Sequence, residues 1–254
     1  MTRRWLTVIA AVAVALALGG GVGGAQTMQT IAVPAYFYPG PLWTQLQAAA
    51  PAVGLVVANP NSGPGVAADP NYAAAIAQSQ THGQRVIGYV HTSYGQRSQS
   101  DVLAEVDRYF AWYRVDGIFF DEASANCARQ PYYTALRNAV RAHSAAALTV
   151  LNPGTQTAEC YMAAADVIVT FEDTYAAYTH SYSAPRWVNS YAPERFWHIV
   201  HTTATTQQMQ NAVRLSQQRR AGRIYVTNDV LPNPYDTLPA AYWSAEVAQV
   251  TGNR

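Results

Sequence analysis

From residue 31 onward, the chain alternates short, continuously apolar runs with longer segments of helical pattern. Each short run is rich in β-branched or aromatic residues, as is typical of strands that are buried on both faces of a sheet. The runs that predict strands are Ile31–Tyr38, Val53–Asn59, Arg85–His91, Gly117–Asp121, Leu148–Asn152, Val167–Glu172, Trp197–Thr202 and Arg223–Asn228. Buried strands that alternate with helices indicate an α/β protein with parallel strands.

The intervening segments carry the spacing and the end signals of amphipathic helices. The segments that predict helices include Tyr72–His82, Asp101–Tyr113, Tyr132–Ala142 and Gln207–Arg220. In the second of these, Val102, Val106 and Phe110 keep the spacing of one helical face. The first is preceded by Asp69-Pro70, a capping residue followed by a first-turn proline.

Eight strands, each followed by a helix or a short connection, predict a (β/α)8 TIM barrel. The alternative is an open doubly wound sheet, which usually has a Gly-rich turn after its first strand. Here the first strand runs into Pro39-Gly40-Pro41, with no G-x-G-x-x-G motif. No linker-like stretch interrupts the pattern, so we expect one domain that comprises residues 26–254.

Composition excludes several function classes. All 16 basic residues are arginines, and a Schiff-base aldolase or a P-loop NTPase needs a lysine at the centre of its chemistry. Charged residues make up 12% of the chain, the formal net charge is +1, and no segment is a basic run. Because nucleic-acid binding needs a clustered cationic face, we expect no nucleic-acid partner.

Residues 1–25 have the organisation of a secretory signal peptide. Arg3 and Arg4 precede an apolar run from Leu6 to Leu18, and small residues lead to a predicted cleavage site after Ala25. The alternative is a membrane anchor, but the run is shorter than the roughly 20 residues that span a bilayer. We therefore expect a secreted protein, monomeric and without a membrane anchor after cleavage.

Cys127 and Cys160 are the two cysteines of the chain. In an oxidising compartment, two cysteines most simply form one disulfide, which we expect here. The alternative is a pair of buried, unpaired thiols. A metal site built on these cysteines would need histidines nearby in the sequence, and none stands there.

The active site of a (β/α)8 barrel lies at the C-terminal ends of its strands. The acids that we expect to be catalytic there are Asp121, Glu122 and Glu172. The residues that we expect to contact substrate are Tyr36, Tyr38, Asn59, His91, Asn152, Asp173, His201, Asn228 and Asp229. Tyrosine rings stack on sugar rings, and the amides, acids and histidines hydrogen-bond to sugar hydroxyls.

The acids at these ends suggest glycoside hydrolysis. Asp121-Glu122 and Glu172 follow strongly apolar strands, so they lose part of their hydration, which raises carboxyl pKa values. Two carboxyl groups in different environments supply the protonated acid and the ionised nucleophile or base of a glycosidase. The alternative is a structural role, because an acid at a strand end often caps the next helix, as Asp173 or Asp229 could.

Other chemistries have weaker support. His91 and His201 would suit a metal-dependent polysaccharide deacetylase, but metal hydrolases on this fold commonly carry H-x-H on the first strand, which here reads Ala32-Val33-Pro34-Ala35-Tyr36. A serine hydrolase needs an elbow such as G-x-S-x-G, which is missing. We therefore expect neither a metal nor another cofactor.

Several strings resemble the spherulin 4 (spherulation-specific family 4) proteins over about residues 31–240. The strings that carry the resemblance are Ile31–Pro39, Ala58–Gly65, Gly88–Thr92, Val115–Glu122, Leu151–Gly154 and Phe171-Glu172. The resemblance implies a secreted (β/α)8 glycoside hydrolase that cleaves α-1,4-linked N-acetylgalactosamine in biofilm exopolysaccharide. It also places the family's acidic motifs at Asp121-Glu122 and Glu172.

Retaining barrels that act on α-linkages often take the nucleophile from the fourth strand and the acid/base from the sixth. This predicts Asp121 as nucleophile, Glu172 as general acid/base, and Glu122 as a partner that sets charge or binds substrate. Asp121 and Glu122 can both face the barrel only if the strand has ended, because adjacent strand residues point to opposite faces. The rival interpretations are attack by the substrate's own N-acetyl group and a non-catalytic barrel that binds carbohydrate or cell wall.

Overall fold

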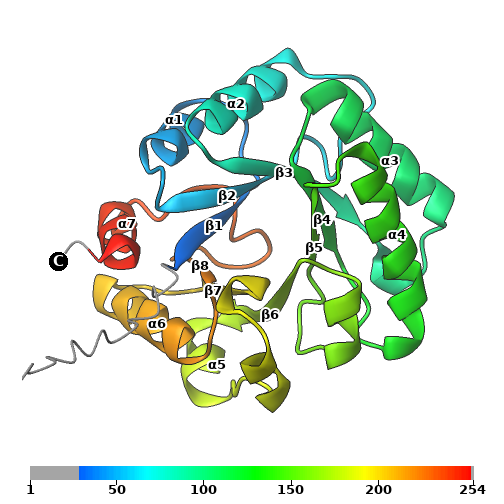
Figure 1. The fold of residues 1–254 in the computed structure, drawn as a ribbon. Coiled ribbons are helices and arrows are strands. Elements are labelled where there is room, and N and C mark those ends of the chain that lie inside the picture. The colour runs from blue at the N-terminus through cyan, green and yellow to red at the C-terminus, as the bar shows by residue number, and fades with distance from the viewer. Residues whose placement is uncertain (1–28, 253–254) are drawn as a thin grey trace, which may run out of the picture.

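Eight parallel strands close into a barrel in chain order, in a computed structural model that describes residues 29–252 (Figure 1). The strands are β1 (Thr30–Ala35), β2 (Val53–Ala58), β3 (Arg85–His91), β4 (Gly117–Asp121), β5 (Leu148–Leu151), β6 (Val167–Thr174), β7 (Phe196–His201) and β8 (Arg223–Val226). The predicted single-domain (β/α)8 barrel is confirmed, and the open-sheet alternative is wrong. Strands β1, β2, β5, β7 and β8 end earlier than expected.

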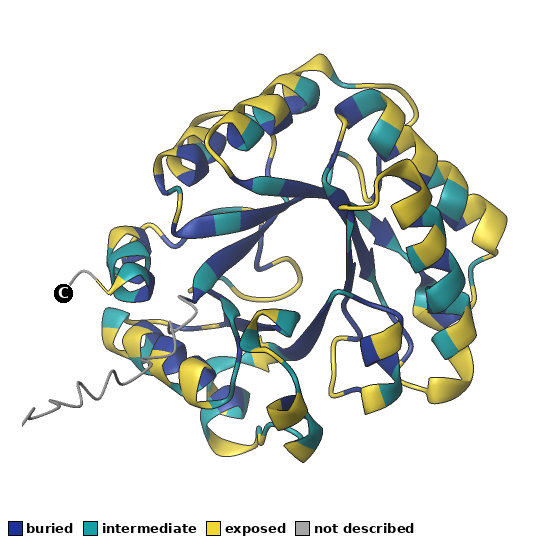
Figure 2. Cartoon of the chain, viewed as in Figure 1, coloured by how far each residue is buried: buried dark blue, intermediate teal, exposed yellow. Residues whose placement is uncertain are grey.

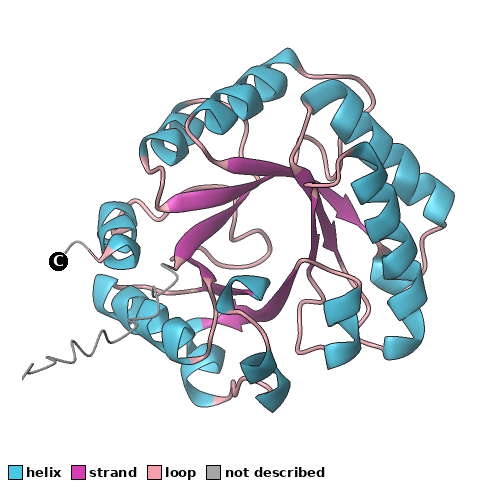
Figure 3. Ribbon diagram, viewed as in Figure 1, coloured by secondary structure: helices cyan, strands magenta, loops and turns pink. Residues whose placement is uncertain are grey.

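Helices surround the barrel (Figure 3). They are α1 (Pro41–Ala48), α2 (Pro70–Thr81), α3 (Gln99–Tyr113), α4 (Gln130–His143), α5 (Tyr175–His180), α6 (Thr206–Gln218) and α7 (Trp243–Thr251). Between β5 and β6 the described chain forms a short 3-10 turn, Glu159–Ala163. Helix α2 begins as its sequence predicts, since Asp69 Oδ1 accepts a 2.8 Å hydrogen bond from the Asn71 amide.

The core consists of the barrel interior and the layer between strands and helices, and the strands are almost wholly buried (Figure 2). Phe119 of β4 and Trp197 of β7 lie 5.6 Å apart between ring centres. These strands are not neighbours in the barrel, so the contact crosses its interior. In β3, Gly88 allows Tyr109 of α3 to pack directly on the strand, because a Cβ atom at Gly88 would lie 2.4 Å from the tyrosine ring.

Strand β6 contains a bulge that decides which way its acid points. Val169 pairs with Trp197 and Phe171 pairs with the next residue of β7, so Thr170 is an extra residue in β6. Trp197 faces the interior, and strict alternation from Val169 would turn Phe171 inward and Glu172 outward. The extra residue reverses this order. Phe171 packs on Tyr178 of α5, 4.6 Å between ring centres, and Glu172 faces the barrel.

A disulfide joins Cys127 to Cys160 and confirms the predicted pairing; the alternative of two free thiols is wrong. It connects the segment after β4 to the segment after β5. The Tyr161 hydroxyl donates a 2.6 Å hydrogen bond to the carbonyl of Asn126, so a second contact joins the same two segments. Both segments follow strands that carry candidate catalytic groups.

We expect the double variant Cys127→Ser/Cys160→Ser to lose about 3–4 kcal/mol of unfolding free energy, because the unfolded chain regains the freedom of a loop with a sequence separation of 33. Denaturant unfolding monitored by circular dichroism measures the loss. Reduced wild-type protein is the matched control and should unfold like the double variant. Equal stability of the oxidised wild type and the double variant would contradict the expectation.

Glu246 of α7 hydrogen-bonds to β8 beyond the point where β8 pairs with β1. The pairing of these strands covers the first two residues of each. Beyond it, Glu246 Oε1 accepts a 2.9 Å hydrogen bond from the Val226 amide. The carboxyl group is fully buried, and among the described residues no group bonds its Oε2. Burial raises the pKa of Glu246 from its ordinary value of 4.5 to about 8.

This pKa predicts that the contribution of Glu246 to the unfolding free energy falls as pH rises. Between pH 4.5 and about 8, folded Glu246 keeps a proton that the unfolded chain has lost, so its stabilisation is full below pH 4.5 and disappears toward pH 8. The slope from this group is at most about 1.4 kcal/mol per pH unit. Denaturant unfolding gives the unfolding free energy at pH 5 and at pH 8, and the change between these two values should be smaller for Glu246→Gln than for wild type. An equal change in both proteins would refute the raised pKa of Glu246.

The predicted signal peptide lies outside the described residues. Within residues 29–252, no helix is long and apolar enough to cross a membrane.

Candidate active site

A hollow of about 390 Å³ lies at the C-terminal ends of the strands. It is lined by Tyr36, Asp121, Gly154, Glu172, Asp173, His201 and the segment 231–235. Both acids predicted to act directly, Asp121 from β4 and Glu172 from β6, therefore reach the same hollow. The bulge in β6 brings Glu172 there, and Asp121 is the last residue of its strand.

One amide group holds the two carboxyl groups together. Asn152 Nδ2 donates 2.9 Å to Asp121 Oδ1 and 2.5 Å to Glu172 Oε2. Since both bonds share one nitrogen, these two oxygens lie no further apart than the sum of the bond lengths, about 5.4 Å. Asn152 Oδ1 accepts from the Gly154 amide at 3.0 Å, which leaves the nitrogen side of the amide facing the acids.

The backbone of Asn152 is also hydrogen-bonded, through both its amide and its carbonyl. Its amide donates 2.9 Å to the Phe120 carbonyl, and its carbonyl accepts 2.8 Å from the Ala123 amide. These bonds continue the pairing of β4 and β5 beyond the end of β5, so Asn152 and Asp121 keep a constant register.

Each carboxyl group also accepts a hydrogen bond from a tyrosine hydroxyl. Tyr89 donates 2.9 Å to Asp121 Oδ2, and Tyr235 donates to Glu172 Oε1. Between them stands Tyr36, whose ring meets those of Tyr89 and Tyr235 edge-on at 5.4 and 5.5 Å. Two side-chain donors therefore orient each acid, and of the three tyrosines Tyr36 and Tyr235 line the hollow.

Burial raises the pKa of Asp121, and hydrogen bonds from Tyr89, the Glu122 amide and Asn152 act in the opposite direction. Burial also raises the pKa of Glu172, and the negative charge of Asp121 raises it further. Two acids this close cannot both ionise easily, so they titrate as a coupled pair. Hydrogen bonds from Tyr235 and Asn152 act against the raised pKa of Glu172 as well, but Asp121 has the Glu122 amide as a further donor, so the Asp121–Glu172 pair favours a proton on Glu172.

Glu122 lies apart from this pair. Its backbone adopts φ 49°, in the left-handed region, so the strand has ended and the chain turns at this residue. Its side chain is 42% exposed, and Oε2 lies 3.6 Å from His91 Nδ1. Glu122 and His91 thus form a rim pair beside the hollow, from which the Glu122 charge adds to the raised pKa of Asp121.

The other predicted contact residues divide between the hollow and its surroundings. Asp173 and His201 line the hollow. Asn59 does not line it; its Oδ1 accepts from the Gly63 amide at 2.9 Å and so holds its own loop. Asn228 is exposed, and Tyr38 lines a different hollow.

The predicted capping alternative for Asp173 and Asp229 is wrong. Thr174 caps α5 by accepting from the Ala177 amide at 3.2 Å, whereas Asp173 Oδ1 accepts from the Thr174 amide at 2.6 Å and the residue lines the hollow. Asp229 lies in the segment after β8, and the next α-helix, α7, has Tyr242 at its cap position. The Asp229 carbonyl accepts 2.8 Å from the Thr202 amide, which ties this segment to the end of β7.

Tyr235 and the segment that carries it were not predicted from the sequence. Residues 231–235 belong to the connection from β8 to α7, which in Figure 1 is the orange loop seen within the ring of strands. The Tyr36 amide donates 3.1 Å to the Tyr235 carbonyl, so this segment folds back beside β1. The Pro232-Asn233-Pro234 string signals a turn, but nothing local indicates that the turn returns to the barrel mouth.

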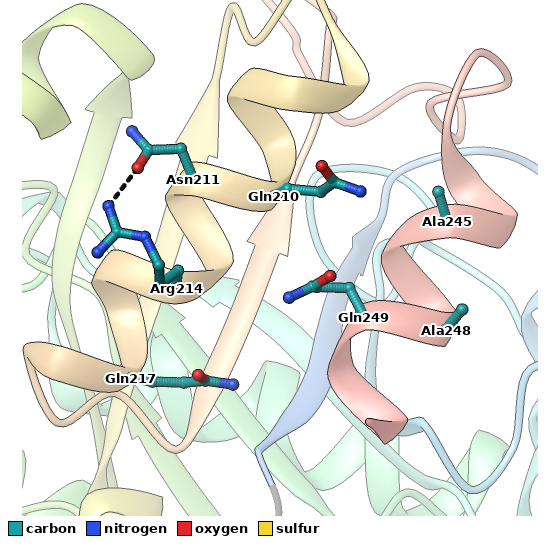
Figure 4. Close-up of a pocket in the computed structure, with 7 residues that line it drawn as sticks. All are labelled: Gln210, Asn211, Arg214, Gln217, Ala245, Ala248 and Gln249. Atoms are coloured by element: carbon teal, nitrogen blue, oxygen red, sulfur yellow. Dashed lines mark hydrogen bonds between the residues drawn. The ribbon is translucent and has the colours of Figure 1, made fainter. Parts of the chain in front are cut away.

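A larger hollow, about 620 Å³, lies between α6 and α7 on the outside of the barrel (Figure 4). Its lining is glutamine, alanine, Asn211 and Arg214, and the last two bond to each other at 2.6 Å. It has no carboxyl group, so it lacks the acid pair that marks the smaller hollow. Among residues 29–252, no three His, Cys, Asp or Glu side chains come together as metal ligands would.

Comparison with known proteins agrees with the barrel architecture of the chain. The chain is 34% identical to Spherulin-4 of Physarum polycephalum over 232 residues, which cover 86% of this chain and 69% of that protein. The crystal structure of Aspergillus clavatus Sph3 in complex with GalNAc superposes with a TM-score of 0.77 at 28% identity, covering 88% of this chain and 97% of that one.

The Bacillus cereus spore cortex-lytic enzyme SleL shares the fold alone, with a TM-score of 0.57 and 10% identity over 89% of this chain and 75% of that one. Residues 30–250 match the family described as Spherulation-specific family 4. This match spans the barrel and includes both acids of the hollow. The chain therefore belongs to the spherulation-specific family 4.

Proposed function

We propose that the chain is a secreted, retaining glycoside hydrolase that cleaves α-1,4-linked N-acetylgalactosamine or galactosamine within an exopolysaccharide. The observation that carries this proposal is the pair Asp121 and Glu172, whose Asn152-bonded oxygens lie no more than about 5.4 Å apart. This upper limit agrees with the roughly 5–5.5 Å of retaining enzymes and lies below the roughly 6.5–9.5 Å that inversion needs. The related Sph3, which was crystallised with GalNAc, supports the sugar class.

The proposed reaction has two steps. Asp121 attacks the anomeric carbon while Glu172 gives its proton to the departing glycosidic oxygen, so one C–O bond forms as another breaks. Glu172, now ionised, then takes a proton from water, and the resulting hydroxide oxygen displaces Asp121 from the sugar. The amide of Asn152 bonds both acids at once, which keeps them aligned while the proton leaves and returns.

Secretion rests on two features. The first 25 residues have the pattern of a signal peptide, and the Cys127–Cys160 disulfide suits an oxidising compartment. A secreted enzyme meets extracellular polysaccharide directly.

Incubation of the purified protein with defined amino-sugar polymers tests the proposal. We expect new reducing ends and shortened oligosaccharides from α-1,4-linked polymers, with the α-anomer appearing first in the proton NMR spectrum. Binding without new reducing ends would favour a non-catalytic carbohydrate-binding barrel. Release of acetate that stops on addition of a chelator would favour a metal-dependent deacetylase. A β-anomer as first product would contradict retention.

The pKa shifts predict a bell-shaped dependence of kcat/KM on pH. Activity requires ionised Asp121, so it falls at low pH, with a limb displaced above the ordinary aspartate value of 3.8. It also requires protonated Glu172, so it falls at high pH, with a limb displaced above the ordinary glutamate value of 4.5. Initial rates across the pH range test both limbs. An alkaline limb at or below 4.5 would contradict the role of Glu172.

A further inference from the structure

A second hollow, about 490 Å³ in volume, lies beside the start of α2. It is formed by residues from the segment 60–71 together with Tyr38 and Tyr113. The active-site mechanism above uses none of these residues. Its volume exceeds that of the hollow holding Asp121 and Glu172, so it has room for a sugar unit.

Tyr38 presents an open aromatic ring in this hollow. The residue is 57% exposed, which is unusual for a large side chain in this protein. Its orientation is nevertheless constrained, because its hydroxyl donates 3.0 Å to Asp69 Oδ2 and accepts 2.7 Å from Asn71 Nδ2. Its ring also meets the buried ring of Tyr72 edge-on at 5.5 Å. A ring held in this way loses little conformational freedom when a ligand stacks on it.

The facing wall of the hollow is also preformed. The Tyr113 hydroxyl donates 3.0 Å to the Pro64 carbonyl and accepts 3.1 Å from the Asp69 amide. These bonds attach Pro64 and Asp69, the two ends of lining segment 64–69, to Tyr113 at the end of α3. Asn59, which does not reach the active site, stabilises the same loop through Gly63. The hollow therefore needs no large rearrangement to accept a ligand.

One short stretch of chain contributes a residue to the active-site hollow and another to the second hollow. Tyr36 lines the active-site hollow and Tyr38 lines the second one. Strand β1 ends at Ala35, and the chain bends at Phe37, so the Cα atoms of Tyr36 and Tyr38 lie no further apart than the roughly 7 Å that two residues can span. The two tyrosines are therefore close enough along the chain for one polysaccharide to contact both.

We propose that Tyr38, with Asp69 and Asn71, forms a distal subsite that binds a sugar unit of the same polysaccharide chain, outside the site of cleavage. The ring face of Tyr38 stacks on the pyranose ring, and the Asp69 carboxylate and the Asn61 and Asn71 amides take its hydroxyl or amino groups. Asp69 is the one charged residue among the described residues that line the hollow. This inference rests on the proposed function, since it requires a polymeric substrate in the active site.

The test compares Tyr38→Ala with Tyr191→Ala in the full chain. Tyr191 is a matched control because its hydroxyl also donates to an acid, Glu159 Oε1 at 2.9 Å, and it precedes β7 at the opposite end of the barrel. We expect Tyr38→Ala to lower the ratio of kcat/KM on polymer to kcat/KM on the shortest cleaved oligosaccharide by about tenfold, as loss of one stacking contact would. Tyr191→Ala should keep the wild-type ratio, and Tyr38→Phe, which retains the ring, should fall between the two. An unchanged ratio in folded Tyr38→Ala would overturn the subsite.

A binding experiment distinguishes failure of the subsite proposal from failure of the proposed function. Affinity electrophoresis in gels containing α-1,4-linked galactosamine polymer measures binding without turnover. Reduced retardation of Tyr38→Ala, with Tyr191→Ala unchanged, supports the subsite even if the wild type cleaves nothing. Equal retardation of wild type and Tyr38→Ala contradicts the subsite even if the wild type cleaves the polymer. If the wild type is not retarded at all, the subsite is rejected for this polymer.

Discussion

Replacing Asp121 by asparagine is expected to lower kcat on the natural polymer by about a thousandfold or more. An amide has the shape of the carboxyl group but is not nucleophilic, so no covalent intermediate forms. The protein should still fold, because Tyr89 and Asn152 surround a side chain of unchanged size. Steady-state rates measure the loss, and thermal unfolding verifies the fold.

Added azide provides a positive test of the role of Asp121. If Asp121 is the nucleophile, the small anion can enter the space left by the lost charge and yield a β-glycosyl azide from an α-linked substrate. Asp236→Asn, an exposed acid that follows Tyr235 in the same connection, is the matched control and should retain activity. A folded Asp121→Asn variant with full turnover would remove Asp121 from the mechanism.

The rival mechanism uses the substrate's N-acetyl group as nucleophile. It requires acetylated sugar, whereas direct attack by Asp121 does not. Cleavage of a fully deacetylated polymer by the wild type, lost in Asp121→Asn, would therefore favour direct attack. Cleavage restricted to acetylated units, with no azide product, would favour the rival.

Replacing Glu172 by glutamine is expected to have the second large effect, a loss of about a hundredfold to ten-thousandfold in kcat, the range attributed to general acid–base catalysis. The departing sugar is a poor leaving group and needs a proton, which in the proposed mechanism comes from Glu172. Glutamine keeps the bonds from Tyr235 or Asn152 in part but supplies no proton. Rates on polymer measure the loss.

The signature of an acid/base residue is the dependence of this loss on the leaving group. A glycosyl fluoride departs without protonation, so its first step should survive in Glu172→Gln and give a burst followed by slow turnover. The alkaline limb of the pH profile should also disappear, since the group that causes it is gone. The same loss on polymer and fluoride, with the alkaline limb retained, would show that Glu172 acts in another way.

The barrel was predictable because its causes are local. A strand covered on both faces must be apolar throughout, and a surface helix must be apolar on one face, so the two patterns alternate visibly along the chain. Parallel strands that are connected through helices place all their C-terminal ends at one mouth. This geometry placed Asp121, Asn152, Glu172 and His201 in one region before any contact was known.

The strand ends were less predictable, with consequences for the site. β1 was expected to reach Tyr38 but ends at Ala35, so Tyr36 and Tyr38 are free to serve two different hollows. Asn59 likewise follows the end of β2 and stabilises a loop. An apolar or aromatic residue just past a strand resembles one inside it, and only the pairing with neighbouring strands distinguishes the two.

Hydrophobic pattern, residue type and chain direction were enough to predict the fold class, the disulfide partners and the rim that carries the acids. Three features of the site arise only from contacts between distant parts of the chain. The bulge at Thr170 turns Glu172 inward, the turn at Glu122 separates that acid from Asp121, and Tyr235 returns to the mouth from the β8–α7 connection. Each depends on which strand or loop lies alongside, a contact between residues far apart in the chain, and no local pattern of side chains specifies such a contact.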